Sequence, residues 1–153
     1  MTDKIWLKHY DPGVPHTLQY PQIPVFQILA EAAKKYPHNP CTTFKGNDIS
    51  YEEMDKLSGA LAAALVDLGI QKGDRVAVFM PNLPQFVLAF FAILKAGGVV
   101  VAINPTYKES ETIFQLNDSG AVLLLGVSNA KSMLEALQPQ TGIRQVIYTD
   151  PDD

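Results

Sequence analysis

Apolar residues recur at intervals of three and four in two early stretches of the chain, which is the spacing of one helix face. Residues 25–36 form the first stretch, and the second follows Ser50. Ser50 and Glu53 have the spacing of a capping box, in which their side chains satisfy free amides at a helix start. Glu52, Glu53 and Asp55 also place negative charge there, where the helix dipole favours it.

Beyond the second helix, short strand-like runs alternate with helical stretches. The predicted elements are a hairpin of residues 41–45 and 48–51 around Gly46-Asn47, a helix stop at Gly69, strands over 75–80, 98–103, 122–126 and 145–149, and helices over 82–96, 109–117 and 128–137, two of them capped by Asn82 and Ser128. Alternation at this spacing is typical of βαβ units. The predicted fold class is α/β with a mainly parallel sheet.

The longest apolar run, residues 86–103, carries a single charge at Lys95. Gly97-Gly98 divides it, and its second half is β-branched, so the run predicts a helix and a buried strand rather than a membrane span. The helix is apolar on nearly every face and is expected to be buried in a larger body. Without such neighbours, the chain is expected to expose a large apolar patch there and to associate.

Four prolines between Pro12 and Pro24 predict that residues 1–24 are an extended leader, without helix, draped over another surface. The chain ends in Asp150-Pro-Asp-Asp directly after the last predicted strand, with no closing helix. We therefore expect residues 25–153 to be a partial α/β subdomain.

Composition narrows the function classes. The 12 Lys and Arg residues against 16 Asp and Glu give a net charge of −4, which argues against a nucleic-acid partner. Cys41 is the single cysteine, so an intrachain disulfide and a Cys-rich zinc site are excluded, and the three His residues lack metal-ligand spacing. The first residues lack the apolar core of a secretory signal, which predicts a cytoplasmic protein.

No phosphate-binding glycine loop occurs in the sequence. Parallel sheets bind ligands beyond the carboxyl ends of their strands. Two loops qualify by position, residues 81–84 and the loop of Asn104, Pro105, Thr106 and Tyr107. The alternative is that both are only turns.

Six segments occur in an order and spacing that resemble one superfamily. They are Ile49-Ser-Tyr-Glu-Glu-Met54, Gly69-Ile-Gln-Lys-Gly-Asp-Arg-Val-Ala-Val78, Met80-Pro-Asn-Leu-Pro-Gln85, Leu94-Lys-Ala-Gly-Gly98, Ile103-Asn-Pro105 and Leu116-Asn-Asp-Ser-Gly-Ala121. The series resembles the AMP-forming acyl-CoA synthetase and adenylating enzyme superfamily over residues 25–150. The leader from Trp6 to Pro15, Asn104-Pro105 with Tyr107, and Val127-Ser-Asn129 look like long-chain fatty acid–CoA ligases.

The resemblance implies an enzyme of lipid metabolism that uses ATP, Mg and coenzyme A. A fatty acid would first form an acyl-adenylate and pyrophosphate, and coenzyme A would then displace AMP. The phosphate loop, the ribose-holding Asp and the catalytic Lys of these enzymes have no counterpart in this sequence. No catalytic, nucleotide-binding or metal residue is therefore assigned, and the chain alone is expected to be inactive and to bind none of these cofactors tightly. Loop 104–107 is expected near the coenzyme A entry.

Alternatives stay open at this point. The acid could be medium-chain, aryl as in 4-coumarate ligases, or an amino acid, because the acid pocket is expected outside this chain. Peripheral membrane association also stays open. A different class is a non-catalytic interaction module whose leader is exchanged in a homodimer. One departure from the family is Lys108, where relatives often have a Thr helix cap, so the following helix is expected to start loosely.

Overall fold

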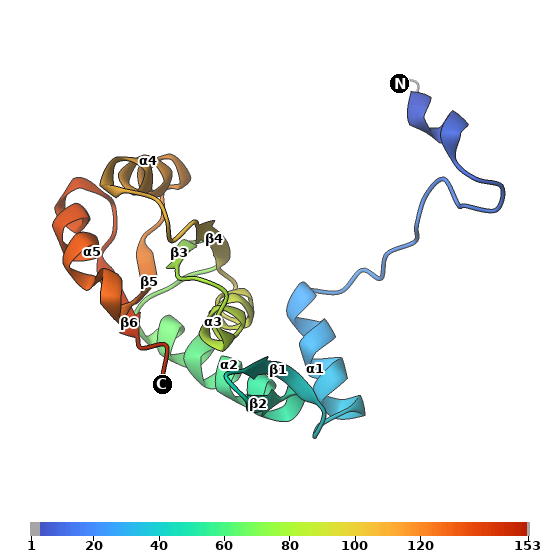
Figure 1. The fold of residues 1–153 in the computed structure, drawn as a ribbon, viewed down its shortest axis with the longest axis horizontal. Coiled ribbons are helices and arrows are strands. Elements are labelled where there is room, and N and C mark those ends of the chain that lie inside the picture. The colour runs from blue at the N-terminus through green and yellow to red at the C-terminus, as the bar shows by residue number, and fades with distance from the viewer. Residues whose placement is uncertain (1–3, 153) are drawn as a thin grey trace.

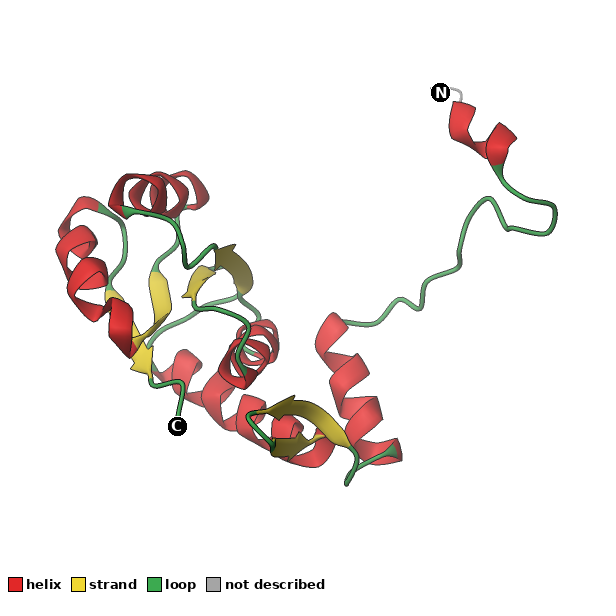
Figure 2. Cartoon of the chain, in the orientation of Figure 1, coloured by secondary structure: helices red, strands yellow, loops and turns green. Residues whose placement is uncertain are grey.

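The computed structural model describes residues 4–152 (Figures 1 and 2). The helices are α1 (Val25–Lys35), α2 (Tyr51–Asp67), α3 (Pro84–Lys95), α4 (Glu109–Ser119) and α5 (Lys131–Leu137), with short 3-10 turns η1 (Ile5–His9), η2 (Ser128–Ala130) and η3 (Gln138–Gln140). The strands are β1 (Pro40–Phe44), β2 (Asn47–Ser50), β3 (Arg75–Phe79), β4 (Val99–Ile103), β5 (Leu123–Val127) and β6 (Gln145–Thr149). The predicted sequence of elements is confirmed, and the apolar run of residues 86–103 is a helix, a turn and a strand.

Four parallel strands form the central sheet in the order β4-β3-β5-β6, which confirms the predicted fold class. Val76 of β3 lies between Val100 of β4 and Leu123 of β5. The helices α2 and α3 cover one face of this sheet, and α4 and α5 cover the other (Figure 1). The chain leaves β3 over the α3 face and β5 over the α5 face, so these two neighbouring strands mark the topological switch of the sheet.

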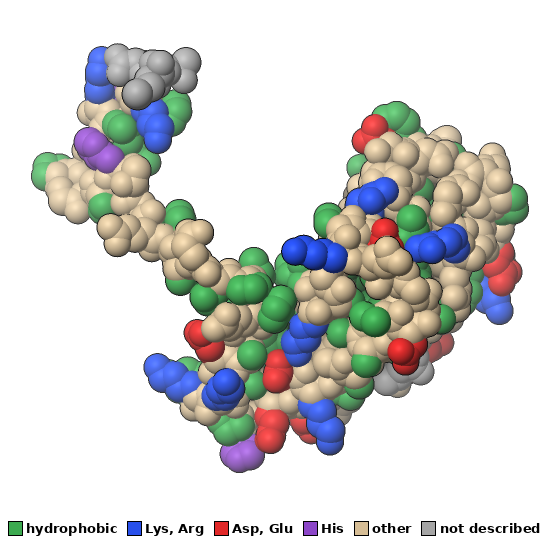
Figure 3. Space-filling model, turned by 180° about the vertical axis from the view of Figure 1, so that it is seen from behind, with side chains coloured by type: hydrophobic (Ala, Val, Ile, Leu, Met, Phe, Trp, Pro, Cys, Tyr) green, Lys and Arg blue, Asp and Glu red, His purple; other side chains and the backbone are tan. Residues whose placement is uncertain are grey.

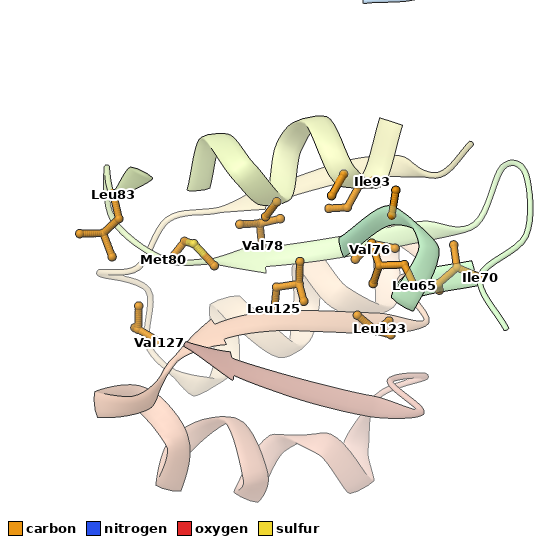
Figure 4. Packing of buried hydrophobic residues seen from close by; sticks show 13 residues of the cluster. Leu65, Ile70, Val76, Val78, Met80, Leu83, Ile93, Leu123, Leu125 and Val127 are labelled. Carbon is orange, nitrogen blue, oxygen red and sulfur yellow. The ribbon is translucent and has the colours of Figure 1, made fainter. Parts of the chain in front are cut away.

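The α3 side holds the larger core (Figure 4). Val76 and Val78 of β3 are fully buried against Leu65 of α2 and Ile93 of α3. Full burial of a side chain of this kind stabilises a fold by roughly 1.5–3 kcal/mol. The alternation of side chains along β3 therefore determines which face of the sheet packs against α2 and α3.

The α5 side is packed closely at Gly126. A Cβ atom at this position of β5 would lie 2.5 Å from Cδ1 of Leu134, a fully buried residue of α5. Glycine here lets the helix approach the sheet, a role that its strand context does not reveal. Ala77 and Phe79 of β3 complete this second core.

Helix starts were predicted with mixed success. The capping box is confirmed, since Ser50 Oγ accepts from the Glu53 amide and the Ser50 amide donates to Glu53 Oε2 at 2.9 Å. The expected cap at Asn82 is wrong, because extended Leu83 occupies that position and Pro84 begins α3. Ser128 lies in a 3-10 turn and does not cap α5.

The start of α4 lacks the side-chain cap that a Thr would supply. Only half of a capping box is present, because the Lys108 amide donates to Glu111 Oε2 at 2.9 Å while the Lys108 side chain caps no amide of the helix, as the missing Thr predicts. The hairpin turn is also shifted by one residue, because Lys45 and Gly46 hold the two positive φ angles, 50° and 82°. Two such residues match the twist of a hairpin.

The leader differs from its prediction. Residues 5–9 form the 3-10 turn η1, because no proline constrains the chain before Pro12. Residues 10–22 are exposed, and the segment stands away from the other elements, so the surface that it is expected to lie over is not part of this chain's own body (Figures 1 and 3).

The expected apolar patch over α3 stays a prediction, because only Ala89, Ala92 and Ile93 of this helix are buried and its other residues are half-buried. No described residue of α3 is highly exposed, because α1, α2 and the sheet surround this helix. The exposed large apolar side chains lie mainly on the leader, on α1 and on α2, and α4 adds Phe114, which is 71% exposed.

Candidate functional site at the carboxyl edge of the sheet

The carboxyl ends of the four parallel strands meet at one edge, where both predicted loops begin. Phe79 of β3 is paired with Ile103 of β4, so loops 81–84 and 104–107 leave the sheet from adjacent strand ends. Loop 104–107 follows the outer strand β4, whereas loop 81–84 follows β3 at the topological switch. The second position is the one where open α/β sheets most often bind ligands.

Loop 104–107 is held in a defined turn. Asn104 Oδ1 accepts hydrogen bonds from the Thr106 amide at 3.0 Å and from Thr106 Oγ1 at 2.9 Å. The Tyr107 amide donates to the Asn104 carbonyl oxygen at 3.0 Å. An asparagine that bonds its own backbone two residues on fixes such a turn. The whole loop is exposed, so it presents a preformed surface.

A shallow hollow of about 440 Å³ lies between this loop and α4. Its lining includes Tyr107 and Phe114, and the carboxylate of Glu111 is engaged at the start of α4. Gln115 Nε2 donates to the carbonyl oxygen of Ala102, which ties α4 to the end of β4. This hollow offers aromatic contact surface next to the loop.

Loop 81–84 is anchored rather than open. Met80 and Leu83 are buried at 4% and 7% exposure, while Pro81 and Asn82 between them are exposed. The loop therefore fixes the start of α3 and leaves one amide side chain, that of Asn82, at the surface. Among the described residues, no hydrogen bond links this loop to loop 104–107.

A polar junction that the sequence analysis missed joins the ends of three other elements. Ser128 Oγ donates to Asp150 Oδ2 at 2.8 Å, and Gln85 Nε2 donates to the Asp150 carbonyl oxygen at 3.1 Å. These contacts join the end of β5, the start of α3 and the residue after β6. A serine directly after a buried strand was the available signal, but it was interpreted as a helix cap.

Three ionisable groups have shifted pKa values. Hydrogen bonds from Ser50 lower the pKa of Glu53, and burial raises the pKa of Cys41. Burial, with a smaller contribution from the Glu135 charge, raises the pKa of Tyr148, whose ring lies 5.6 Å from Lys131 Nζ. All three lie outside the two predicted loops. Within residues 4–152, no group of three His, Cys, Asp or Glu side chains could hold a metal ion.

Comparison with known families identifies the domain. The profile of the AMP-binding enzyme family matches residues 29–153. The chain belongs to this family. A long-chain-fatty-acid–CoA ligase of Yersinia pestis is 39% identical over 153 residues, which cover 99% of this chain and 27% of the relative. The chain thus spans about a quarter of that relative's length, and the superfamily resemblance of the sequence is confirmed.

Solved structures of this family share the fold. The crystal structure of a long-chain-fatty-acid–CoA ligase from Archaeoglobus fulgidus matches 92% of this chain and 30% of that chain, with 26% identity and a TM-score of 0.82. A fatty acyl CoA synthetase of Mycobacterium tuberculosis matches 81% of this chain and 26% of that chain, with 29% identity and a TM-score of 0.75.

Among the described residues, no helix is both long and apolar enough to cross a bilayer.

Proposed function

We propose that this chain is the N-terminal α/β part of a long-chain fatty acid–CoA ligase. The observation that carries the proposal is the 39% identity to such a ligase over 99% of the chain. In the proposed reaction, a fatty acid carboxylate attacks the α-phosphate of ATP, which gives an acyl-adenylate and pyrophosphate. The thiolate of coenzyme A then displaces AMP and forms the thioester.

The proposed contribution of these residues is structural support and positioning. Mg would neutralise phosphate charge in the complete enzyme, where it acts on groups that lie outside residues 1–153. The sequence holds no phosphate loop, and the match covers 27% of the related ligase. We therefore expect the chain alone to lack catalysis and to bind ATP and coenzyme A weakly.

Loop 104–107 is the proposed coenzyme A-proximal element. Its support is its position after a strand's carboxyl end, its preformed turn and the aromatic surface of Tyr107 and Phe114 beside it. In a complete enzyme that carries this segment, Tyr107→Ala should raise the KM for coenzyme A and leave the pyrophosphate exchange step unchanged. Unchanged coenzyme A kinetics would identify the loop as a turn only.

A chimera tests the main proposal. Residues 25–150 replace the matching segment of the Yersinia pestis ligase, and ATP–pyrophosphate exchange is measured with palmitate, octanoate and 4-coumarate. We expect exchange that is fastest with palmitate, and none from the 153-residue chain alone. The unmodified ligase is the positive control. A folded chimera without exchange, or exchange by the isolated chain, would contradict the proposal.

One observation favours a second candidate, a non-catalytic interaction module. The leader exposes large apolar side chains on Trp6, Leu18 and Tyr20, at 55%, 61% and 71%. Side chains of this kind are typical of interface anchors. Sedimentation of the whole chain should then show a dimer that becomes monomeric when residues 1–24 are removed, whereas a monomer in both cases would exclude this candidate.

A further inference from the structure

A pocket of about 410 Å³ lies outside both predicted loops. Four parts of the chain enclose it: the hairpin β1–β2, α2, α3 and the residues that follow β6. Its walls are mainly apolar and include Phe44, Ile49, Met54, Leu57 and Leu88. The volume lies within the roughly 300–1,000 Å³ of small-molecule sites, which are typically apolar with a few polar groups.

A second hollow of about 200 Å³ adjoins the first. The two share Leu88 and Gln85 of α3, and the second reaches Met80 and Leu125 at the sheet. The first hollow lies beneath the hairpin, and the second lies on the other side of the shared residues, at the α3-side core. The lining of both is mainly apolar, which suits an apolar chain better than a polar ligand.

The mouth of the pocket carries one pair of opposite charges. Lys45 Nζ lies 2.6 Å from Asp152 Oδ1, and their side chains are 59% and 76% exposed. They are the only ionisable groups among the described residues that line the pocket. An exposed pair of this kind is weak and exchangeable. The structure thus shows a carboxylate held by an ammonium group directly at the entrance to an apolar space.

We propose that this pocket binds the alkyl chain of a long-chain carboxylate, whose carboxylate replaces Asp152 on Lys45. Lys45 offers an ion-pair partner that an acid can use and a neutral alcohol cannot, and the apolar walls favour an alkyl chain. The choice of a fatty acid among such amphiphiles rests on the proposed function. The pocket would hold the acid by apolar burial and one ion pair, with no covalent step.

Binding is measured on the whole chain by titration calorimetry, with octanoate, decanoate, dodecanoate and dodecanol below their aggregation concentrations. Each buried methylene should tighten binding by roughly fourfold. Dodecanoate should bind more tightly than dodecanol. Absence of binding, or equal affinity for acid and alcohol, would overturn the proposal.

Two substitutions at the mouth test the exchange. Lys45→Met should abolish the preference for dodecanoate over dodecanol, whereas Lys72→Met, at an exposed lysine outside the pocket, should preserve it. Asp152→Asn should strengthen dodecanoate binding because it removes the competing carboxylate, and it should leave dodecanol unchanged. If both mouth variants bind the acid as the wild type does, the ion pair has no part in the site.

A matched pair, Leu57 of α2 and Leu68 at the C-cap of that helix, tests the walls. Leu57 and Leu68 are 46% and 43% exposed, but only Leu57 lines the pocket. Leu57→Trp should fill the space and weaken dodecanoate binding at least tenfold, while Leu68→Trp should not. Equal affinity in the two variants would indicate adsorption to the surface. A dimer that Leu57→Trp converts to monomer would identify a second copy as the occupant and overturn the proposal.

These outcomes are separate from those of the chimera. A chain that binds dodecanoate while the chimera lacks exchange keeps the pocket and loses the ligase proposal. If the chimera is active but the isolated 153-residue chain binds no acid, the ligase proposal is kept and the pocket proposal is lost. Circular dichroism of each variant confirms that it is folded before binding is interpreted.

Discussion

Two lysines in different regions show how burial changes what an ion pair does. Lys95, at the end of α3, donates to Asp55 Oδ1 and to the Asp55 carbonyl oxygen at 2.7 Å, and to Ser58 Oγ at 2.8 Å. Its side chain is 16% exposed, and Ser58 is fully buried. Lys45 has one carboxylate partner and is 59% exposed.

The two sites therefore have different consequences. The ammonium of Lys95 has three acceptors in a partly buried joint between α2 and α3, so its loss leaves the Asp55 carboxylate without its cationic partner. The ammonium of Lys45 remains hydrated, so its partner can be exchanged at little cost. The first lysine holds the fold, and the second is available for binding.

Lys95→Met gives the largest expected effect. It keeps the apolar stem and removes the charge that joins the two helices, and we expect a loss of about 2–3 kcal/mol in the free energy of unfolding. Urea denaturation followed by circular dichroism measures this loss.

Lys56→Met is the control, because Lys56 is exposed on α2 directly after Asp55, the partner of Lys95. It should change the unfolding free energy by less than about 0.5 kcal/mol. Asp55→Asn keeps the side-chain oxygen and the carbonyl oxygen as acceptors but removes the negative charge. Its unfolding free energy should lie between those of the two lysine variants. A Lys95→Met protein as stable as the wild type would show that the joint is held by apolar packing alone.

The sequence could predict what local periodicity determines. The residue spacing located every strand of the parallel sheet, and the capping box at Ser50 followed from two residues three apart. Prediction from residue spacing failed where neighbouring residues compete for one role, as at the N-cap of α3. Asn82 has the chemistry of a cap, but Pro84 fixes the first turn of α3 and places Leu83 at the cap position.

The interactions that distinguish the two lysines lie beyond local pattern. Lys95 could be interpreted only as a charge that interrupts an apolar run, because Asp55 and Ser58 are 40 and 37 residues away. Lys45 and Asp152 are 107 residues apart. The pocket between them is formed when the hairpin folds back over α2 and α3, so no segment of the sequence contains it.

Removing the capping box should reduce the unfolding free energy by an amount between the effects of Lys95→Met and Lys45→Met. Ser50→Ala removes the side-chain acceptor of the Glu53 amide and should cost about 1 kcal/mol of unfolding free energy. Urea denaturation at neutral pH measures it. Glu53→Gln isolates the charge, since glutamine can still accept a hydrogen bond at this position.

The contribution of the Glu53 charge to the free energy of unfolding depends on pH with a defined sign. The pKa of Glu53 is lower in the folded protein, so the unfolded state binds more protons as the pH falls. The stabilisation by its charge is complete above the ordinary glutamate pKa and is lost as the pH falls through the folded value. The stability difference between wild type and Glu53→Gln should therefore disappear in acid. A difference that is independent of pH would exclude the charge as its source.

Lys45→Met gives the smallest effect on stability and sharpens the comparison most. An exposed ion pair with one partner contributes little, so we expect the free energy of unfolding to change by less than about 0.5 kcal/mol. The same protein should lose its preference for dodecanoate over dodecanol. Measured on one sample, these results separate binding from folding, because a structural role for Lys45 would move both quantities together. A loss of stability comparable to that of Lys95→Met would show that the hairpin is fixed to the residues after β6, and that its lysine is not free to exchange partners.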